Sequence, residues 1–261
     1  MKILITNDDG IDSDGLVAME KIAMAISNSR ESVFVVAPKS NQSAKSNSLT
    51  FNEPFKIEQI TKQRYSVEGT PTDCVIFAMD HLMKEGKPDL LLSGINKGYN
   101  LSEDVFYSGT VGAAIEGSFR GVLSIAISQC YNSETMSQKN MFDFAEKNGA
   151  DLCLKLYNNF NKHQSNEEVI FNVNFPVEPI KSYPKCIRSI PIGRRAVSNF
   201  VCNQKKQLEN FITAEISSRK ENDSIAIESD FLACLEGYIT VSPINTNLNH
   251  EMLLKELDKV L

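Results

Sequence analysis

Short runs of β-branched and apolar residues alternate with longer amphipathic segments along most of this chain of 261 residues. Residues 2–6 form the first apolar run, and residues 33–37 form the second, which ends at Pro38. Between them, Asp14 is placed to cap a helix that continues to about Ser29 with its apolar residues on one stripe. Alternation of this kind predicts helices on both faces of a mainly parallel sheet.

The same plan continues through the middle of the chain. Thr72 is placed to cap an apolar helix that ends at Gly86, and residues 89–92 form another buried strand. Ser108 then precedes a helix of small residues, and residues 122–127 form the next strand. We therefore predict an α/β fold, a Rossmann-like three-layer sandwich with a mainly parallel sheet.

The character of the sequence changes near residues 180–190. Prolines interrupt the chain at positions 176, 179, 184 and 191, and the strand-like segments beyond them are shorter and more polar. We expect a Rossmann-like core over residues 1–185 and a separate C-terminal segment over residues 186–261. Helical spacing of apolar residues within residues 251–261 predicts a terminal helix that includes Met252, Leu253, Leu257 and Val260.

Charge and hydropathy limit the partners and the compartment of the chain. The formal net charge is -6 at pH 7, so the chain lacks the basic surface that polymeric nucleic acid or an anionic membrane requires. The six cysteines include no C-x-x-C pair, which favours reduced thiols. Residues 2–6 are too short for a signal peptide, and no apolar run is long enough to span a membrane. We expect a cytoplasmic protein.

Two adjacent carboxylates, Asp8 and Asp9, follow the first predicted strand at a glycine turn. In open α/β sheets, ligands bind outside the carboxyl ends of the strands, which is where this pair falls. Two neighbouring anions repel each other, and a divalent cation that prefers oxygen ligands, Mg²⁺ or Mn²⁺, would stabilise them. A solvated Asp-Gly turn explains the same residues, so the pair alone leaves both interpretations open.

Two further predicted strand ends carry many polar groups. Residues 38–48 are rich in hydroxyl and amide side chains, and residues 93–100 combine glycines with Asn96, a neutral oxygen ligand. Each segment taken alone is typical of a solvated surface loop. Because both follow strands, as Asp8 and Asp9 do, the three segments together favour one shared polar site.

Ser108, Gly109 and Thr110 open a predicted helix. The unpaired N–H groups and the dipole of a helix start attract anions such as phosphate. An ordinary serine cap explains the same residues. The chain contains neither G-x-x-x-x-G-K-[ST] nor G-x-G-x-x-G, which argues against a P-loop ATPase and a dinucleotide-binding protein.

Paired carboxylates without a partnered cysteine or histidine nucleophile favour a mechanism in which a bound metal ion activates a water. In this hypothesis Asp8 and Asp9 are the catalytic residues, and a cation that they bind lowers the pKa of a water for in-line attack on the phosphoryl group. Donors at the Ser108 helix start would stabilise the developing charge. Two alternatives stay open: Asp8 as a nucleophile that forms an aspartyl phosphate, and a non-enzymatic module that only binds metal or nucleotide.

Six blocks of the sequence carry most of these polar residues. They are Asn7-Asp8-Asp9-Gly10, Val35-Val36-Ala37-Pro38 with Ser43, Gly69-Thr70-Pro71-Thr72-Asp73, Ser93-Gly94-Ile95-Asn96, Tyr107-Ser108-Gly109-Thr110-Val111 and, near the C-terminus, Ser229-Asp230-Phe231 with Gly237-Tyr238-Ile239-Thr240-Val241-Ser242-Pro243. In this order, and over nearly the whole chain, they resemble the family of the stationary-phase survival protein SurE.

The resemblance implies a 5'-nucleotidase, a phosphoric monoester hydrolase that converts nucleoside 5'-monophosphates to nucleoside and phosphate. It also implies possible action on 3'-monophosphates and, as in some members, on short polyphosphate. One divalent ion per subunit, Mg²⁺ or Mn²⁺, would be held by the residues that match the family's ligands, namely Asp8, Asp9, Ser43 and Asn96. The residues that the resemblance places near the phosphate of the substrate are Asn100, Ser108, Gly109 and Thr110.

The resemblance also concerns the C-terminal part of the chain. Family members form dimers or tetramers that exchange a C-terminal segment, so residues 186–261 would be an extended β/α arm for a homodimer or homotetramer. The sequence departs from the family at Lys39 and Gln42, where many relatives have an acidic and a basic residue. Some relatives also have a histidine near the Gly237-Tyr238 block, where this chain has Leu232 and Leu235. The resemblance therefore carries over no catalytic histidine.

Overall fold

The computed structural model describes residues 1–136, 140–161, 169–194, 200–208, 210–218, 229–249, 253–254 and 257. The strands are β1 (Ile3–Thr6), β2 (Val33–Pro38), β3 (Ile57–Thr61), β4 (Arg64–Val67), β5 (Leu90–Lys97), β6 (Leu123–Gln129), β7 (Ile170–Phe175), β8 (Ile187–Ser189), β9 (Phe200–Leu208), β10 (Phe211–Ser218) and β11 (Ile239–Ile244). The helices are α1 (Asp14–Ser27), η1 (Arg30–Ser32), α2 (Pro71–Phe77), η2 (Ala78–Leu82), η3 (Ser102–Phe106), α3 (Gly109–Phe119), α4 (Ser133–Met136), α5 (Asp143–Phe160) and α6 (Asp230–Leu235). Within the described residues, none of these helices has the length and hydropathy to cross a membrane.

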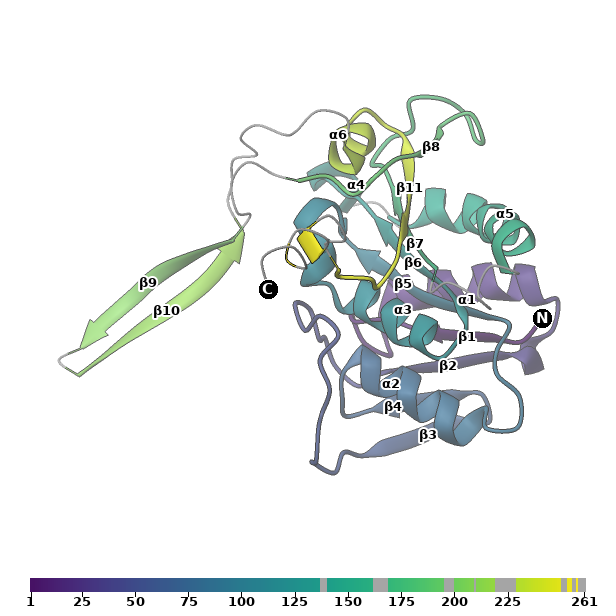
Figure 1. Ribbon diagram of the computed structural model, residues 1–261, viewed down its shortest axis with the longest axis horizontal. Helices are drawn as coiled ribbons and strands as arrows, with labels where there is room; N and C mark the ends of the chain where they lie inside the picture. Colours follow the sequence, from purple (N-terminus) through teal and green to yellow (C-terminus); the bar gives the residue numbers. More distant parts are fainter. Residues whose placement is uncertain are drawn as a thin grey trace.

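A nine-stranded sheet in the order β3-β4-β2-β1-β5-β6-β7-β11-β8 runs through the centre of the fold (Figure 1). β1 pairs in parallel with β2 and β5, and β6 and β7 continue the parallel run, whereas β3 and β11 pair antiparallel with their inner neighbours. Parallel pairing places the carboxyl ends of β1 and β5 at the same edge of the sheet. The predicted α/β fold with a mainly parallel sheet is confirmed.

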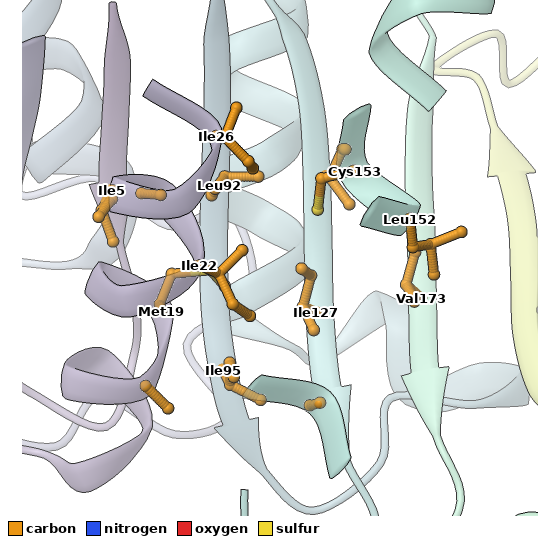
Figure 2. Packing of buried hydrophobic residues seen from close by; sticks show 14 of the residues in the cluster. Ile5, Met19, Ile22, Ile26, Leu92, Ile95, Ile127, Leu152, Cys153 and Val173 are labelled. Atoms are coloured by element: carbon orange, nitrogen blue, oxygen red, sulfur yellow. The ribbon is translucent and has the colours of Figure 1, made fainter. Parts of the chain in front are cut away.

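One face of the sheet is covered by α1 and α5. Ile5, Leu92 and Ile127 of the central strands pack with Ile22 of α1 and Leu152 of α5 in a single buried cluster (Figure 2). Each such side chain stabilises the fold by about 1.5–3 kcal/mol when it leaves water. Strands that are buried on both faces are continuously apolar, which explains the short apolar runs in the sequence.

The opposite face is covered by α2 and α3. Leu4 and Leu91 of the strands pack there with Val75 of α2 and Ala113 of α3. Successive side chains of a strand point to opposite faces, so β1 contributes Leu4 to this core and Ile5 to the other. The three layers predicted from the sequence are therefore present.

Two predicted helix caps are wrong by one or two residues. α1 is capped by Ser13 rather than Asp14, because Ser13 has the extended backbone of a cap and its Oγ accepts a hydrogen bond from an N–H of the first turn. α2 is capped by Thr70 rather than Thr72. Thr70 Oγ1 accepts from Asp73 N at 3.1 Å and Asp73 Oδ2 accepts from Thr70 N at 2.8 Å, which is a complete capping box.

The C-terminal part of the chain divides between the main sheet and a separate hairpin. β8 and β11 join the edge of the sheet, and α6 packs against β11. β9 and β10 form an antiparallel hairpin that projects away from the sheet (Figure 1). Strands on both sides of residue 185 share one sheet, and the boundary predicted there stays a prediction. Of the predicted terminal helix, Leu253, Leu254 and Leu257 are helical, and the other residues lie outside the described part of the chain.

Candidate active site

A cavity of about 430 Å³ opens at the edge of the sheet where β1 and β5 end. This volume is within the range of roughly 300–1,000 Å³ that small-molecule sites occupy. Its wall draws on the end of β5, on the loops that follow β1, β2, β5 and β6, and on the first residue of β9. The wall residues are Asp8, Ser43, Ala44, Asn96, Lys97, Gly98, Tyr99, Asn100, Asp104, Tyr107, Ser108, Tyr131 and Phe200.

The turn after β1 is fastened by the side chain of Asn7. Its Nδ2 donates to Gly10 O at 3.0 Å and to Ser13 Oγ at 2.7 Å, and its Oδ1 accepts from Gly10 N at 3.3 Å. Gln42 N donates to Asp8 O at 2.7 Å and so ties the loop after β2 to the same turn. Asp8 is only 4% exposed, and is thereby held at the strand end rather than in a solvated turn.

The N-terminus of α3 lies against the Asp8 carboxylate. Thr110 Oγ1 donates to Asp8 Oδ1 at 2.6 Å. A Cβ on Gly109 would come within 2.9 Å of Asp8 Cβ, so a glycine is needed for α3 to approach this closely. Ser108 caps the helix, since its Oγ accepts from Val111 N at 3.1 Å. The helix start therefore already interacts with one anion, the Asp8 carboxylate.

Asp9 follows Asp8 and its Oδ2 accepts a hydrogen bond from Lys97 N at 3.1 Å. Burial raises the pKa of Asp8 to about 6; the hydrogen bond from Thr110 opposes this rise and the charge of Asp9 adds to it. Burial also raises the pKa of Asp9, against the lowering effect of Lys97. Two adjacent carboxylates are thus held where their negative charge is poorly solvated, and a bound cation would relieve this.

Asn96 and Ser43 bring neutral oxygen atoms to the same wall. Asn96 Nδ2 donates to Gly98 O at 3.1 Å, which leaves Asn96 Oδ1 available as a ligand. Ser43 lies in the loop after β2, and Ser46 N of this loop donates to Tyr107 O at 3.0 Å. The loop is therefore anchored to the segment that precedes α3.

Asn100 is held by side-chain amides of β7. Asn174 Oδ1 accepts from Asn100 N at 2.8 Å and Asn174 Nδ2 donates to Asn100 O at 3.2 Å, as the backbone of a neighbouring strand would. Asn172 Nδ2 donates to the same oxygen at 2.7 Å, and Asn100 Nδ2 donates to Ser128 Oγ at 2.9 Å. The second hydrogen of Asn100 Nδ2 remains for a ligand in the cavity.

The oxygen atoms gathered at this wall fit a hard divalent cation. Carboxylate, amide and hydroxyl oxygens are the ligand types that Mg²⁺ and Mn²⁺ prefer. In the described part of the chain, no three histidine, cysteine, aspartate or glutamate side chains gather as a metal site would require. A cation beside Asp8 and Asp9 would therefore depend on neutral ligands, for which Ser43 and Asn96 are placed.

The structure brings the predicted site residues to one place. Those on the cavity wall are Asp8, Ser43, Asn96, Asn100 and Ser108. Asp9, Gly109 and Thr110 are not wall residues but contact them: Asp9 Oδ2 accepts from Lys97 N, and the other two contact Asp8. The metal-binding and substrate-binding roles of all these residues stay predictions.

The sequence prediction missed the aromatic part of the wall. Tyr107 directly precedes Ser108, so its position beside the helix start was a usable signal. Phe200 comes from the start of β9, and its ring meets that of Tyr107 edge to face with centroids 4.9 Å apart. No pattern in the sequence connects these two residues. The other aromatic wall residues are Tyr99 and Tyr131.

Known proteins match this chain over its length. The family model described as Survival protein SurE matches residues 3–199. The 5'-nucleotidase SurE of Azorhizobium caulinodans is 37% identical, with 100% of this chain and 98% of that protein covered. The 5'-nucleotidase SurE of Rhizorhabdus wittichii is 38% identical, with 97% of each covered. A crystal structure of the SurE protein from Aquifex aeolicus is similar with a TM-score of 0.79 at 32% identity, covering 100% of this chain and 99% of that one.

Proposed function

The chain belongs to the survival protein SurE family, and from this membership we propose that it hydrolyses nucleoside 5'-monophosphates to nucleoside and phosphate. It is an enzyme of the 5'-nucleotidase class, the activity by which its full-length relatives are named. The observation that supports this most is the convergence on one cavity of Asp8 and Ser43, from the loops after β1 and β2, and of Asn96, from the end of β5, beside the start of α3. Oxygen ligands next to a helix N-terminus suit a phosphate ester that is bound together with a cation.

Asp8, Asp9, Ser43 and Asn96 would hold one divalent ion, Mg²⁺ or Mn²⁺. When bound, such an ion polarises phosphoryl oxygens and lowers the pKa of a water molecule. Thr110 fixes the orientation of the Asp8 carboxylate through its 2.6 Å hydrogen bond to Oδ1. The backbone N–H of Lys97 does the same for Asp9.

The phosphate of the substrate would lie in the cavity, beside the point where Asp8 and the start of α3 meet. Ser108 lies on the wall there, and Asn100 offers a side-chain N–H beside it. The N–H of Gly109, in the first turn of α3, has no partner within the helix and would be the backbone donor next to Ser108. These groups would stabilise charge on the transferred phosphoryl group, and each well-aimed donor contributes about 3 kcal/mol, or on the order of a hundredfold in rate.

The aromatic wall residues favour a nucleoside over a small alcohol as the leaving group. Tyr107 and Phe200 meet edge to face and present ring surface next to the phosphate position. 3'-Monophosphates and short polyphosphate carry a terminal phosphoryl group that the same ligands can bind. We therefore include them as further substrates of this site.

The C-terminal segment, residues 186–261, would join protomers into a homodimer or homotetramer. The β9–β10 hairpin exposes Phe211, Ile212 and Ile216, each by more than half of its surface. A lone two-stranded hairpin is at best marginally stable in water, so a neighbouring protomer would support it. The cytoplasmic location expected from the sequence stays a prediction.

Phosphate release from 5'-AMP tests this function. We expect steady turnover with added Mg²⁺ or Mn²⁺ and its loss in excess chelator. Stoichiometric nucleotide binding without turnover would instead support the non-enzymatic module. A phosphoenzyme trapped by rapid quenching would support Asp8 as nucleophile, whereas ¹⁸O from solvent in the phosphate without a trapped adduct would support direct attack by water.

A further inference from the structure

The loop that joins β5 to α3 forms a large part of the cavity wall. Five of its side chains lie there, namely Tyr99, Asn100, Asp104, Tyr107 and Ser108. The backbone of Asn100 is fixed by Asn172 and Asn174 of β7. Asp104 lies within η3, and Tyr107 and Ser108 follow it, so the position of this short helix determines where these three residues lie.

The first turn of η3 lacks the usual local support. Leu101 occupies the N-cap position, and its side chain accepts no hydrogen bond from the turn. Ser102, the first residue of η3, has a φ of 53°, in the left-handed region that residues other than glycine rarely adopt. Ser102 is fully buried, so its N–H needs a partner within the protein.

That partner is Asp230, which lies 128 residues further along the chain at the start of α6. Asp230 Oδ2 accepts from Ser102 N at 3.0 Å, and Oδ1 is 3.4 Å from Ser102 Oγ. Asp230 is fully buried, and in the described part of the chain no cation pairs with it. Its carboxylate therefore does for η3 what a capping side chain would do, from a distant part of the sequence.

A third segment meets the same carboxylate. Gly193 N donates to Asp230 Oδ1 at 2.8 Å. A Cβ on Gly193 would lie 2.4 Å from Ser229 Cβ and 3.0 Å from Ser102 Oγ, so the junction has no room for a larger residue. Gly193 precedes β9, whose first residue, Phe200, lies on the cavity wall. One buried carboxylate thus joins three segments: the loop between β5 and α3, the segment before the hairpin, and α6.

We propose that Asp230 is a positioning residue of this enzyme, which acts through the backbone N–H of Ser102 to set η3 and the wall residues that follow it. The inference rests on the proposed nucleotidase function for its kinetic consequence, but not for its structural one. Asp230 touches neither Asp8 nor Asn96, so its loss leaves the side of the cavity that Asp8 and Asn96 form intact. The start of α3 is also held by the hydrogen bond from Thr110 to Asp8, and Asn100 by Asn174, so the groups that would stabilise the transferred phosphoryl group stay in place. Loss of Asp230 therefore weakens substrate binding more than it slows the chemical step.

The variant Asp230→Asn tests this. Asparagine has nearly the same size, but its NH₂ group cannot accept from Ser102 N while its oxygen accepts from Gly193 N. We expect KM for 5'-AMP to rise about tenfold and kcat to change less than about threefold, because small misplacements of binding groups cost on the order of ten- to a hundredfold. Hydrogen exchange of the amides of residues 102–106 should accelerate in the same variant.

Ser229→Ala is the matched control. Ser229 Oγ accepts from Leu232 N at 3.3 Å and caps α6, the helix that begins at Asp230. Its loss therefore destabilises α6 but leaves the hydrogen bond from Ser102 to Asp230 in place. We expect Ser229→Ala to lower the melting temperature with KM and exchange at residues 102–106 unchanged. If both variants gave the same KM and the same exchange, Asp230 would be only a structural residue and the proposal would be overturned.

The wild-type protein supplies a measurement that depends neither on folding of a variant nor on activity. Because Ser102, Gly193 and Phe231 donate their backbone N–H to one carboxylate, these three amides should show similar, strong protection from exchange. Fast exchange at Ser102 alone would overturn the inference. A wild-type enzyme without phosphate release from 5'-AMP would instead refute the proposed function, while the exchange data would still decide the role of Asp230.

Discussion

The two sides of the cavity are held in place by different parts of the fold. The Asp8 side consists of turns that directly follow buried parallel strands, and its main support, Asn7, is the neighbouring residue. The opposite side, which runs from Asn100 to Ser108, is held by Asn174 and Asp230, far away in the sequence. A ligand site can thus combine one side that local sequence determines with another that depends on long-range contacts.

Because the two sides of the cavity are held differently, substitutions on each side should have different effects. Changes on the Asp8 side should affect chemistry while the fold stays intact, since the strand below it is supported by the main core. Changes on the Asn100 side should affect the position of the binding groups. The following predictions test this division, from the largest expected effect to the smallest.

Asp8→Asn should lower kcat/KM more than about a hundredfold, equivalent to about 3 kcal/mol, because it removes a charged ligand from the carboxylate pair. The melting temperature without metal should not fall, since the variant also removes the buried charge of Asp8 beside the partly buried Asp9. Phosphate release measures kcat/KM, and calorimetry measures the melting temperature. Asp12→Asn, at an exposed position nearby, is the control. Normal turnover of Asp8→Asn would contradict the assignment.

Leu92→Ala should destabilise the protein by about 3 kcal/mol, because Leu92 is fully buried in β5 and the surrounding core would collapse only partly. Denaturant unfolding measures this loss. KM measured well below the melting temperature should stay near the wild-type value, because the change lies beneath the cavity. Val17→Ala on α1, where the side chain is about half exposed, should cost less than about 0.5 kcal/mol. Equal losses for both variants would contradict the packing described here.

Thr110→Val should break the one side-chain hydrogen bond that links α3 to Asp8. A hydrogen bond to a charged group contributes about 1.5–3 kcal/mol, so we expect kcat/KM to fall on the order of tenfold or more. Steady-state kinetics with 5'-AMP measures this. Thr110→Ser keeps the hydroxyl and should retain most of the activity. If the serine variant were as impaired as the valine variant, packing rather than the hydrogen bond would be responsible.

Phe211→Ser should change the stability of the protomer by less than about 0.5 kcal/mol, because the Phe211 side chain is 58% exposed. It should nevertheless lower the molar mass in solution, which light scattering measures, if the hairpin joins protomers. Leu49→Ser, at a half-exposed position outside the hairpin, is the control. An unchanged assembly in Phe211→Ser would contradict the role proposed for the C-terminal segment.

Periodicity and strand ends alone were enough to predict the fold class and the Asp8 side of the site. Parallel strands end at one edge of a sheet, so polar residues that follow different strands must come near each other. Asp8 and Asn96 were found in this way, and the SurE resemblance added Ser43 and Asn100. The predicted caps at Asp14 and Thr72 failed because capping depends on backbone conformation, which composition does not specify to within one residue.

The long-range contacts that complete the site were decided by the tertiary structure. The hydrogen bond from Thr110 to Asp8, the ring contact between Phe200 and Tyr107, and the hydrogen bond from Ser102 to Asp230 each join residues about a hundred positions apart. Two buried asparagines on one face of β7 were a signal in the sequence, but not one that named Asn100 as their partner. The physical reason is the distance along the chain over which each feature is determined. Periodicity is local and indicates which face of an element is buried, whereas the partner of a single buried polar group is determined only when distant segments pack together.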